Sequence, residues 1–360
     1  MTGSIRGGNR TVSPPFGDNR LGLRWHCFKQ RVFPRAVRPH HMRLHDTAVV
    51  TESSLEAELG LVRAVTLRPV AGPFGPGSMM WQINRESILF AAAGRALLLQ
   101  LAHPWVAAAI TDHSEAVQQP LRRFHRTFAV VFAQVFGTLD QAVAAARALH
   151  RRHSRVTGTL KSAIGAFEAG TPYCANNVAA LRWVHATLID SAVVAHDLLL
   201  APLTDDMRER YFADSRLFAA LFGIPQSSLP ANYREFAAYV GQMLESPVLT
   251  VSPAARQIGR QLLADNDVSL GVPAGYRGLT MMLLPERLRD EFGLRYRPAE
   301  RGDAERAIAW GRAVYPLLPA RLRYVAPYHE AMERLAGRPA PTPATRLLNR
   351  FWIGGGSLGQ

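Results

Sequence analysis

Apolar residues recur at helical spacing along most of this 360-residue chain, and the alternation typical of a half-buried strand is nowhere sustained. A turn rich in proline and glycine at residues 69–77 precedes the helices, and prolines, glycines and capping residues mark their ends. The predicted helices span residues 88–102, 104 onward, 120–137, 138–158, 177–200, 204–222, 230–245, 253–265, 280–292 and 303–317. The pattern predicts an all-α fold, a single multi-helix domain.

The helix predicted at 138–158 places two histidines on its inward face. Thr138 with Gln141 three residues later has the form of a capping box, which predicts the start of this helix. On a helical wheel, His150 and His153 lie on the apolar face. That face also holds Val143, Ala146, Leu149 and Val156, and the opposite face holds Arg147, Arg151, Arg152 and Arg155. His185 points inward in the same way on the helix predicted at 177–200.

An inward histidine has two interpretations. A neutral imidazole packed on an apolar helix face can ligate a haem iron. More often, such a residue belongs to the core and is hydrogen-bonded to a carbonyl group. The spacing alone does not choose among His150, His153 and His185.

The helix predicted at 120–137 has a polar trio opposite its apolar face. The apolar face consists of Leu121, Phe124, Phe128, Val131, Phe132 and Val135. Arg123, Arg126 and Thr127 lie roughly opposite, and Arg123 and Thr127 share a face because they are four residues apart. The pattern by itself favours a solvated arginine face. Val130 and Ala133 share that second side, so the trio can instead line a cavity in a helix buried on both sides.

Charge is concentrated at the beginning of the chain. Residues 1–50 hold nine basic and two acidic residues, 9 − 2 = +7, which is half of the net charge of +14. We interpret this leader as a disordered tail, although such a segment can also dock on nucleic acid or an anionic membrane. Two cysteines form no disulfide scaffold, and neither a signal peptide nor a spanning helix is expected. A cytoplasmic protein is therefore the expectation.

Several common catalytic motifs are missing from the sequence. It contains no HExxH, CxxC, Walker loop, GxGxxG or GxSxG. This disfavours metallohydrolase, nucleotide-binding and serine-hydrolase functions.

A series of segments carries a family resemblance. They are GRALLLQLAHPWVAAAITDHS (94–114), RRFHRT (122–127), HSRVTG (153–158), WVHATLIDS (183–191), LFGIPQSSLP (221–230), LPERLRDEFGLRY (284–296) and LLPARLRYVAPYHEAMERLAG (317–337). Each is weak alone, but their common order from about residue 81 to 337 resembles the family of haem-dependent oxygenases that includes rubber oxygenase (latex clearing protein) and the fungal MpaB enzymes.

The resemblance implies a globin-like helical core that encloses haem b. It matches His153, with Val156 and Gly158, to the family's HxxVxG-like motif, whose histidine is the proximal iron ligand. It also matches Arg123 and Thr127 to the RxxxT pattern of the haem pocket.

Three further residues complete the expected site. Arg126 stands where rubber-cleaving members can have a lysine, and an arginine stays protonated and does not ligate iron. His185 remains a second inward histidine for contact with the cofactor, and Asp112 is the nearest carboxylate to the position of a glutamate used by rubber-cleaving members.

The function that the resemblance implies is a haem b oxygenase that adds dioxygen to an alkene of a hydrophobic small molecule such as an isoprenoid, with or without cleavage. The lack of a matched glutamate and of a secretion signal argues against rubber as the substrate. The expected domain covers residues 80–340, followed by a tail at 341–360. No specific nucleic acid partner is expected, while peripheral membrane contact is compatible with the sequence. The alternatives are a haem- or lipid-binding helical protein without turnover and an interaction protein that uses the leader.

Overall fold

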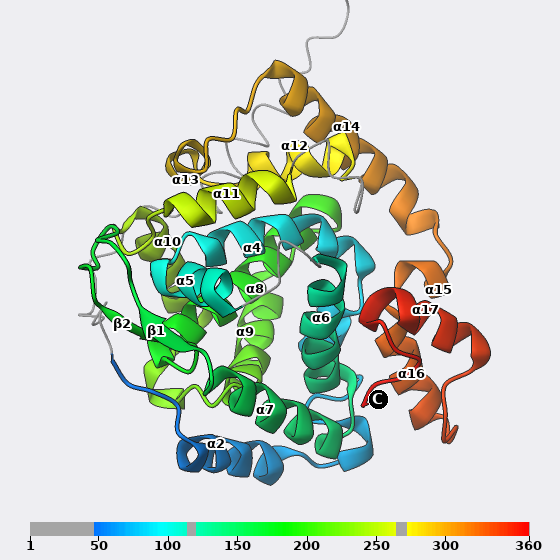
Figure 1. Cartoon of the computed structure of the whole chain (residues 1–360). Helices are drawn as coiled ribbons and strands as arrows, with labels where there is room; N and C mark the ends of the chain where they lie inside the picture. Colours follow the sequence, from blue (N-terminus) through cyan, green and yellow to red (C-terminus); the bar gives the residue numbers. More distant parts are fainter. Residues whose placement is uncertain (1–46, 114–119, 264–271, 360) are drawn as a thin grey trace, which may run out of the picture.

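The computed structural model describes residues 47–113, 120–263 and 272–359 (Figure 1). The predicted all-α fold is confirmed, because helices make up most of the described chain and its one sheet has two short strands. These strands, β1 (Thr157–Thr159) and β2 (Pro172–Cys174), pair antiparallel with Gly158 opposite Tyr173.

The helices follow one another along the chain, and the connection from α7 to α8 contains β1 and β2. They are α2 (Glu52–Val65), α3 (Met79–Asn84), α4 (Ala93–Leu101), α5 (Pro104–His113), α6 (Pro120–Phe136), α7 (Leu139–His153), α8 (Val178–Leu199), α9 (Asp205–Ala220), α10 (Tyr233–Glu245), α11 (Pro253–Leu262), α12 (Ala274–Leu283), α13 (Glu286–Glu291), α14 (Pro298–Val314), α15 (Ala320–Arg323), α16 (Ala326–Leu335) and α17 (Pro343–Ile353). Short 3₁₀ helices lie at η1 (Pro69–Ala71), η2 (Ser87–Ala92), η3 (Gln226–Ser228) and η4 (Tyr315–Leu317).

The central helix of the core is α8. By length and composition α8 could cross a membrane, but 89% of its most apolar window is buried inside the molecule, as in the core helix of a globular protein. The buried Trp183 on α8 donates a hydrogen bond from Nε1 to the carbonyl oxygen of Leu99 on α4, 2.9 Å away. Asp190 on α8 pairs with the fully buried Arg95 of α4 at 2.6 Å. These contacts fix α4 against α8.

The predicted capping box of α7 is confirmed. The amide of Gln141 donates to Thr138 Oγ1 at 3.1 Å, and the amide of Thr138 donates to Gln141 Oε1 at 2.9 Å. Gly137, between α6 and α7, lies against Gly72 after η1, where a Cβ on Gly72 would be 2.1 Å from the Gly137 carbonyl oxygen. The junction that starts α7 is therefore set by both local capping and a close backbone approach.

Three predicted helix boundaries were wrong. The helix expected at 138–158 ends at His153, and Gly158 lies in β1 because its backbone pairs with β2. The helix expected at 88–102 is divided into η2 and α4, where the amide of Gly94 is bonded to the hydroxyl of Tyr276. The helix expected at 280–292 is divided into α12 and α13 at Pro285, which cannot donate a backbone hydrogen bond.

The two ends of the chain differ in what the structure describes. Most of the predicted basic leader, residues 1–46, lies outside the described residues. The stretch 341–360, expected as a tail, contains α17, which packs on α6 and α16 (Figure 1).

Candidate functional site

The predicted cofactor residues lie on α6, on α7 and in the segment that follows α7. His153 is the last residue of α7, Val156 lies in the following turn, and Gly158 lies in β1. Arg123 and Thr127 lie in the first half of α6. Helices α6 and α7 pack against each other, so their polar residues belong to one region of the molecule.

The three candidate histidines differ in their side-chain contacts. His150 Nε2 lies 3.0 Å from the carbonyl oxygen of Val50, and His185 Nε2 lies 2.8 Å from that of Ser215. His185 is 1% exposed, as expected of a histidine that serves the core. The ring of His153, which is partly exposed, has no hydrogen bond to any other described residue. His153 is thus the candidate whose ring nitrogens remain available.

The surroundings of His153 favour its neutral form. Burial, followed by repulsion from Arg152 and His150, lowers the pKa of the His153 imidazole from 6.5 to about 4. The imidazole is therefore unprotonated at neutral pH. This is the form that binds a metal ion.

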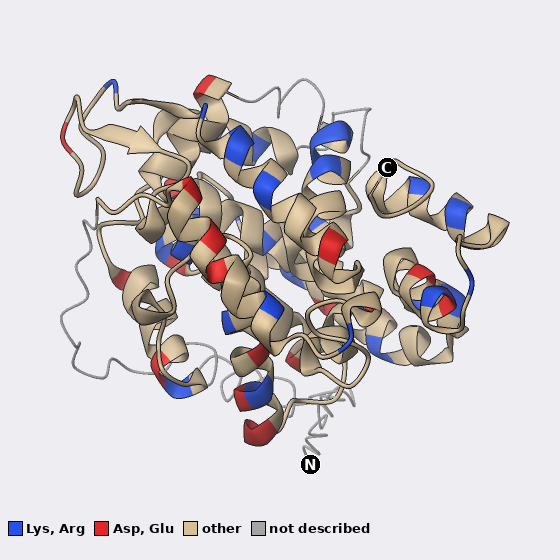
Figure 2. Ribbon diagram, turned by 90° about the horizontal axis from the view of Figure 1, so that it is seen from below, with Lys and Arg blue, Asp and Glu red and all other residues tan. Residues whose placement is uncertain are grey.

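Arginines gather beside this histidine. Burial and then repulsion from Arg126 lower the pKa of Arg123, and the same two causes lower the pKa of Arg152. Figure 2 shows that Lys and Arg positions are distributed over many helices of the molecule. Arg126 thus lies close to both Arg123 and Arg152, and clustered guanidinium groups are suited to binding an anion such as a carboxylate.

Asp112 ends α5 and is already held by neighbouring side chains. Its Oδ2 accepts a hydrogen bond from the hydroxyl of Tyr173 at 2.9 Å, and its Oδ1 lies 3.3 Å from Lys161 Nζ. Burial and the bond to Asp112 raise the pKa of Tyr173 to about 12, so the phenol keeps its proton and donates it to this bond. Asp112 connects α5 to the strand that faces Gly158.

Gly158 is required by the close approach of Tyr173. A Cβ at Gly158 would lie 2.5 Å from the Tyr173 oxygen and 2.7 Å from the ring carbon that carries it. Its backbone amide and carbonyl groups face the paired strand, so the whole segment after His153 is tied to β2. The glycine of the HxxVxG pattern thus lets Tyr173 lie over the strand that follows the histidine.

Two residues of this region were missed by the sequence reasoning. Arg152 is predicted on the outer face of its helix and is exposed there, and Arg126 lies close enough to lower the pKa of the Arg152 guanidinium. Tyr173 was not singled out, because a three-residue strand has too short a pattern to reveal its partner. No sequence signal within either segment identifies these neighbours.

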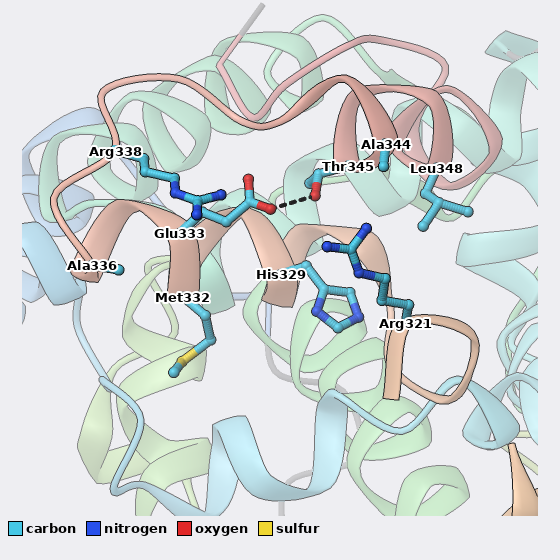
Figure 3. A pocket seen from close by; sticks show the side chains of 9 residues that line it. All are labelled: Arg321, His329, Met332, Glu333, Ala336, Arg338, Ala344, Thr345 and Leu348. Atoms are coloured by element: carbon cyan, nitrogen blue, oxygen red, sulfur yellow. Dashed lines mark hydrogen bonds between the residues drawn. The ribbon is translucent and has the colours of Figure 1, made fainter. Parts of the chain in front are cut away.

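A surface pocket lies elsewhere. It has a volume of about 270 Å³ and lies between α15, α16 and α17, and it is lined by Arg321, His329, Met332, Glu333, Ala336, Arg338, Ala344, Thr345 and Leu348 (Figure 3). Glu333 in this pocket accepts a hydrogen bond from the Thr345 hydroxyl at 2.8 Å. None of the predicted site residues lines it. In the described part of the chain, no three His, Cys, Asp or Glu residues form a metal cluster.

Comparisons with known proteins bear on the family. Residues 80–314 match the family described as ER-bound oxygenase mpaB/B'/Rubber oxygenase, catalytic domain. No curated protein and no solved structure matches the chain. The family match covers well over half of the sequence and includes all the candidate residues of α5, α6, α7 and α8. The chain therefore belongs to the mpaB/rubber oxygenase catalytic-domain family and is an enzyme of the oxygenase class.

Proposed function

We propose that this protein is a haem b-dependent oxygenase that adds dioxygen to an alkene of a hydrophobic small molecule, such as an isoprenoid, with or without cleavage of the double bond. The observation that carries this proposal is the state of His153. Its imidazole is neutral at pH 7 and has no hydrogen bond to a described residue, and it lies near a group of arginines. Neutral imidazole is a common axial ligand of haem iron.

The residues present fit this cofactor. His153 would be the iron ligand, and Arg123 and Arg126 would hold the carboxylates of the porphyrin, which are anions of the kind that clustered guanidinium groups bind. Val156 and Gly158 would keep the segment after His153 in place. His185 stays a prediction as a cofactor contact, its Nε2 being bonded to Ser215. When bound, haem b supplies an iron that activates dioxygen.

Arg123 and Thr127 would act on the reacting side of the site. They lie one helical turn apart on α6, and both can donate hydrogen bonds. Such donors polarise dioxygen and stabilise negative charge that develops on oxygen. Asp112 would contribute a carboxylate near the substrate, although its two oxygens are engaged with Tyr173 and Lys161.

The substrate is proposed to be small and apolar rather than polymeric. The position before Thr127 is Arg126 and not lysine, which distinguishes this chain from rubber-cleaving relatives. We further propose that the enzyme works in the cytoplasm on a substrate that it takes up together with dioxygen.

The ligand assignment is tested by an absorption spectrum of protein produced with sufficient haem. We expect a Soret band in the wild type that is lost or shifted in His153→Ala. His150→Gln is the matched control, because His150 lies on the same helix and is bonded to Val50 instead. An unchanged band in His153→Ala, or no band in the wild type, contradicts the assignment.

Catalysis is tested by oxygen consumption. The loaded enzyme should consume dioxygen in the presence of at least one terpenoid alkene and form an oxygenated product detectable by mass spectrometry. Haem binding without consumption across a broad panel of alkenes would instead support a binding protein without turnover.

A further inference from the structure

The apolar face of α6 is an aromatic ladder. Phe124, Phe128, Phe132 and Phe136 follow one another at intervals of four residues, with consecutive ring centroids 4.5, 5.8 and 6.0 Å apart. The opposite side of the same helix carries Arg123 and Thr127. Whatever holds the ladder therefore also sets the positions of these two polar residues.

Phe90 of η2 packs into the ladder. Its ring centroid lies 5.8 Å from that of Phe124, 4.6 Å from Phe128 and 6.1 Å from Phe132. Trp352 of α17 lies against Phe90 at 4.7 Å and against Phe132 at 6.2 Å. The Trp352 indole thus holds Phe90 against the aromatic ladder of α6, the helix that also carries the polar trio of Arg123, Arg126 and Thr127.

A second contact joins α17 to the beginning of α6. His125 Nε2 lies 2.9 Å from the carbonyl oxygen of Phe351, and a Cβ on Gly354 would lie 2.8 Å from His125 Nδ1. His125 stands between Arg123 and Thr127 in the sequence. The end of α17 is therefore bound to α6 beside the proposed cofactor residues.

The C-terminal segment is itself firmly held. The buried carboxylate of Glu330 on α16 accepts hydrogen bonds from Asn349 Nδ2 at 2.6 Å and from the amide of Leu358 at 3.0 Å. Gln141 on α7 donates to the carbonyl oxygen of Leu358 at 2.8 Å. Figure 1 shows α17 beside α6. Segment 343–358 is thereby connected to α6, α7 and α16 together.

We propose that Trp352, which lies outside the family-matched residues 80–314, is a positioning residue that sets α6 and so the places of Arg123, Arg126 and Thr127. It acts through Phe90 and through Phe132 of the aromatic ladder. The role toward the cofactor rests on the proposed function, whereas the mechanical role toward α6 does not.

The test compares Trp352→Ala, Trp352→Phe and Leu347→Ala in the full chain. Leu347 is the matched control, since its side chain is a large apolar group on the same helix but is 65% exposed. Hydrogen–deuterium exchange of residues 121–131 is measured without haem, and the rate of haem loss is measured after loading. We expect Trp352→Ala to speed both exchange and haem loss roughly tenfold. Trp352→Phe should restore most of the protection, and Leu347→Ala should leave both unchanged.

Each outcome of this experiment tests a different part of the proposal. Unchanged exchange in α6 of Trp352→Ala overturns the positioning role, whether or not haem binds. Faster exchange with unchanged haem loss shows that α6 is loosened without consequence for the cofactor, which overturns the link to the site. A wild type that binds no haem contradicts the proposed function alone, and exchange still decides whether Trp352 positions α6.

Discussion

The hydroxyl of Tyr173 lies where the β-carbon of any larger residue at position 158 would be. A Cβ at Gly158 would come within 2.5 Å of the Tyr173 oxygen, while that oxygen donates a hydrogen bond to Asp112 at 2.9 Å. Three segments, the end of α5, β1 and β2, are thus fixed together immediately after His153. The backbone that follows His153 is thus held by packing that surrounds a glycine.

We predict that Gly158→Ala destabilises the protein by about 1–3 kcal/mol, because the added methyl group forces Tyr173 to move. The change is measured by urea unfolding. Gly60→Ala in α2 is the control: nothing lies within 4 Å of its Cβ, so it should be neutral or stabilise by up to about 1 kcal/mol. Equal free energies of unfolding for Gly158→Ala and the wild type would contradict this prediction and show that the Tyr173 side chain can move without loss of stability.

Arg126→Gln should weaken haem retention by roughly tenfold, because a charge-assisted hydrogen bond to a carboxylate contributes about 1.5–3 kcal/mol. The rate of haem transfer to an acceptor protein measures this. Arg151→Gln is the control, since Arg151 is exposed on α7 and is not among the causes of the lowered pKa of Arg123 or Arg152. Equal loss from both variants would assign the effect to net charge alone.

Stability should fall as the pH falls from 6.5 towards 4. Burial lowers the pKa of both His103 and His185 from 6.5 to about 4, so in this range the unfolded chain binds protons that the folded chain does not. The contribution of these two histidines to the free energy of unfolding is complete above pH 6.5 and is lost as the pH falls towards 4. Urea unfolding midpoints at pH 7 and pH 5 measure the slope, which should be shallower in His185→Asn. A slope identical to that of the wild type would rule out His185 as a source.

Breaking the buried ion pair of α4 and α8 should be costly. Arg95 is 0% exposed, forms an ion pair with Asp190, and donates hydrogen bonds to the Ser191 hydroxyl at 2.8 Å and to the Leu283 carbonyl oxygen at 3.1 Å. Arg95→Leu leaves the Asp190 carboxylate uncompensated, and we expect a loss of about 3–5 kcal/mol in the free energy of unfolding.

The control for this pair lies on the surface. Arg210 and Asp206 form an ion pair at 3.0 Å with both side chains more than half exposed. Arg210→Ala should therefore cost less than about 1 kcal/mol. Similar losses in the free energy of unfolding for Arg95→Leu and Arg210→Ala would contradict the prediction that burial makes the first ion pair more costly to break.

Local sequence determined the all-α class and several helix ends. Pro104 and Pro120 begin α5 and α6 as expected, and Thr138 with Gln141 forms the predicted cap of α7. These features act within one helical turn, so a single segment contains all the information that they need. Family resemblance, carried by the order of many short segments, was confirmed by the match over residues 80–314.

Tertiary structure decided which groups of distant segments the candidate residues contact. Helical periodicity does not distinguish His150, His153 and His185, and the resemblance favours His153. In the structure, the rings of His150 and His185 contact the carbonyl groups of Val50 and Ser215, which are distant in sequence. Likewise, the contact between Trp352 and Phe90 joins residues far apart in the chain. Periodicity shows which face of a helix is apolar but not which group of another segment will meet it, because that depends on how the helices pack.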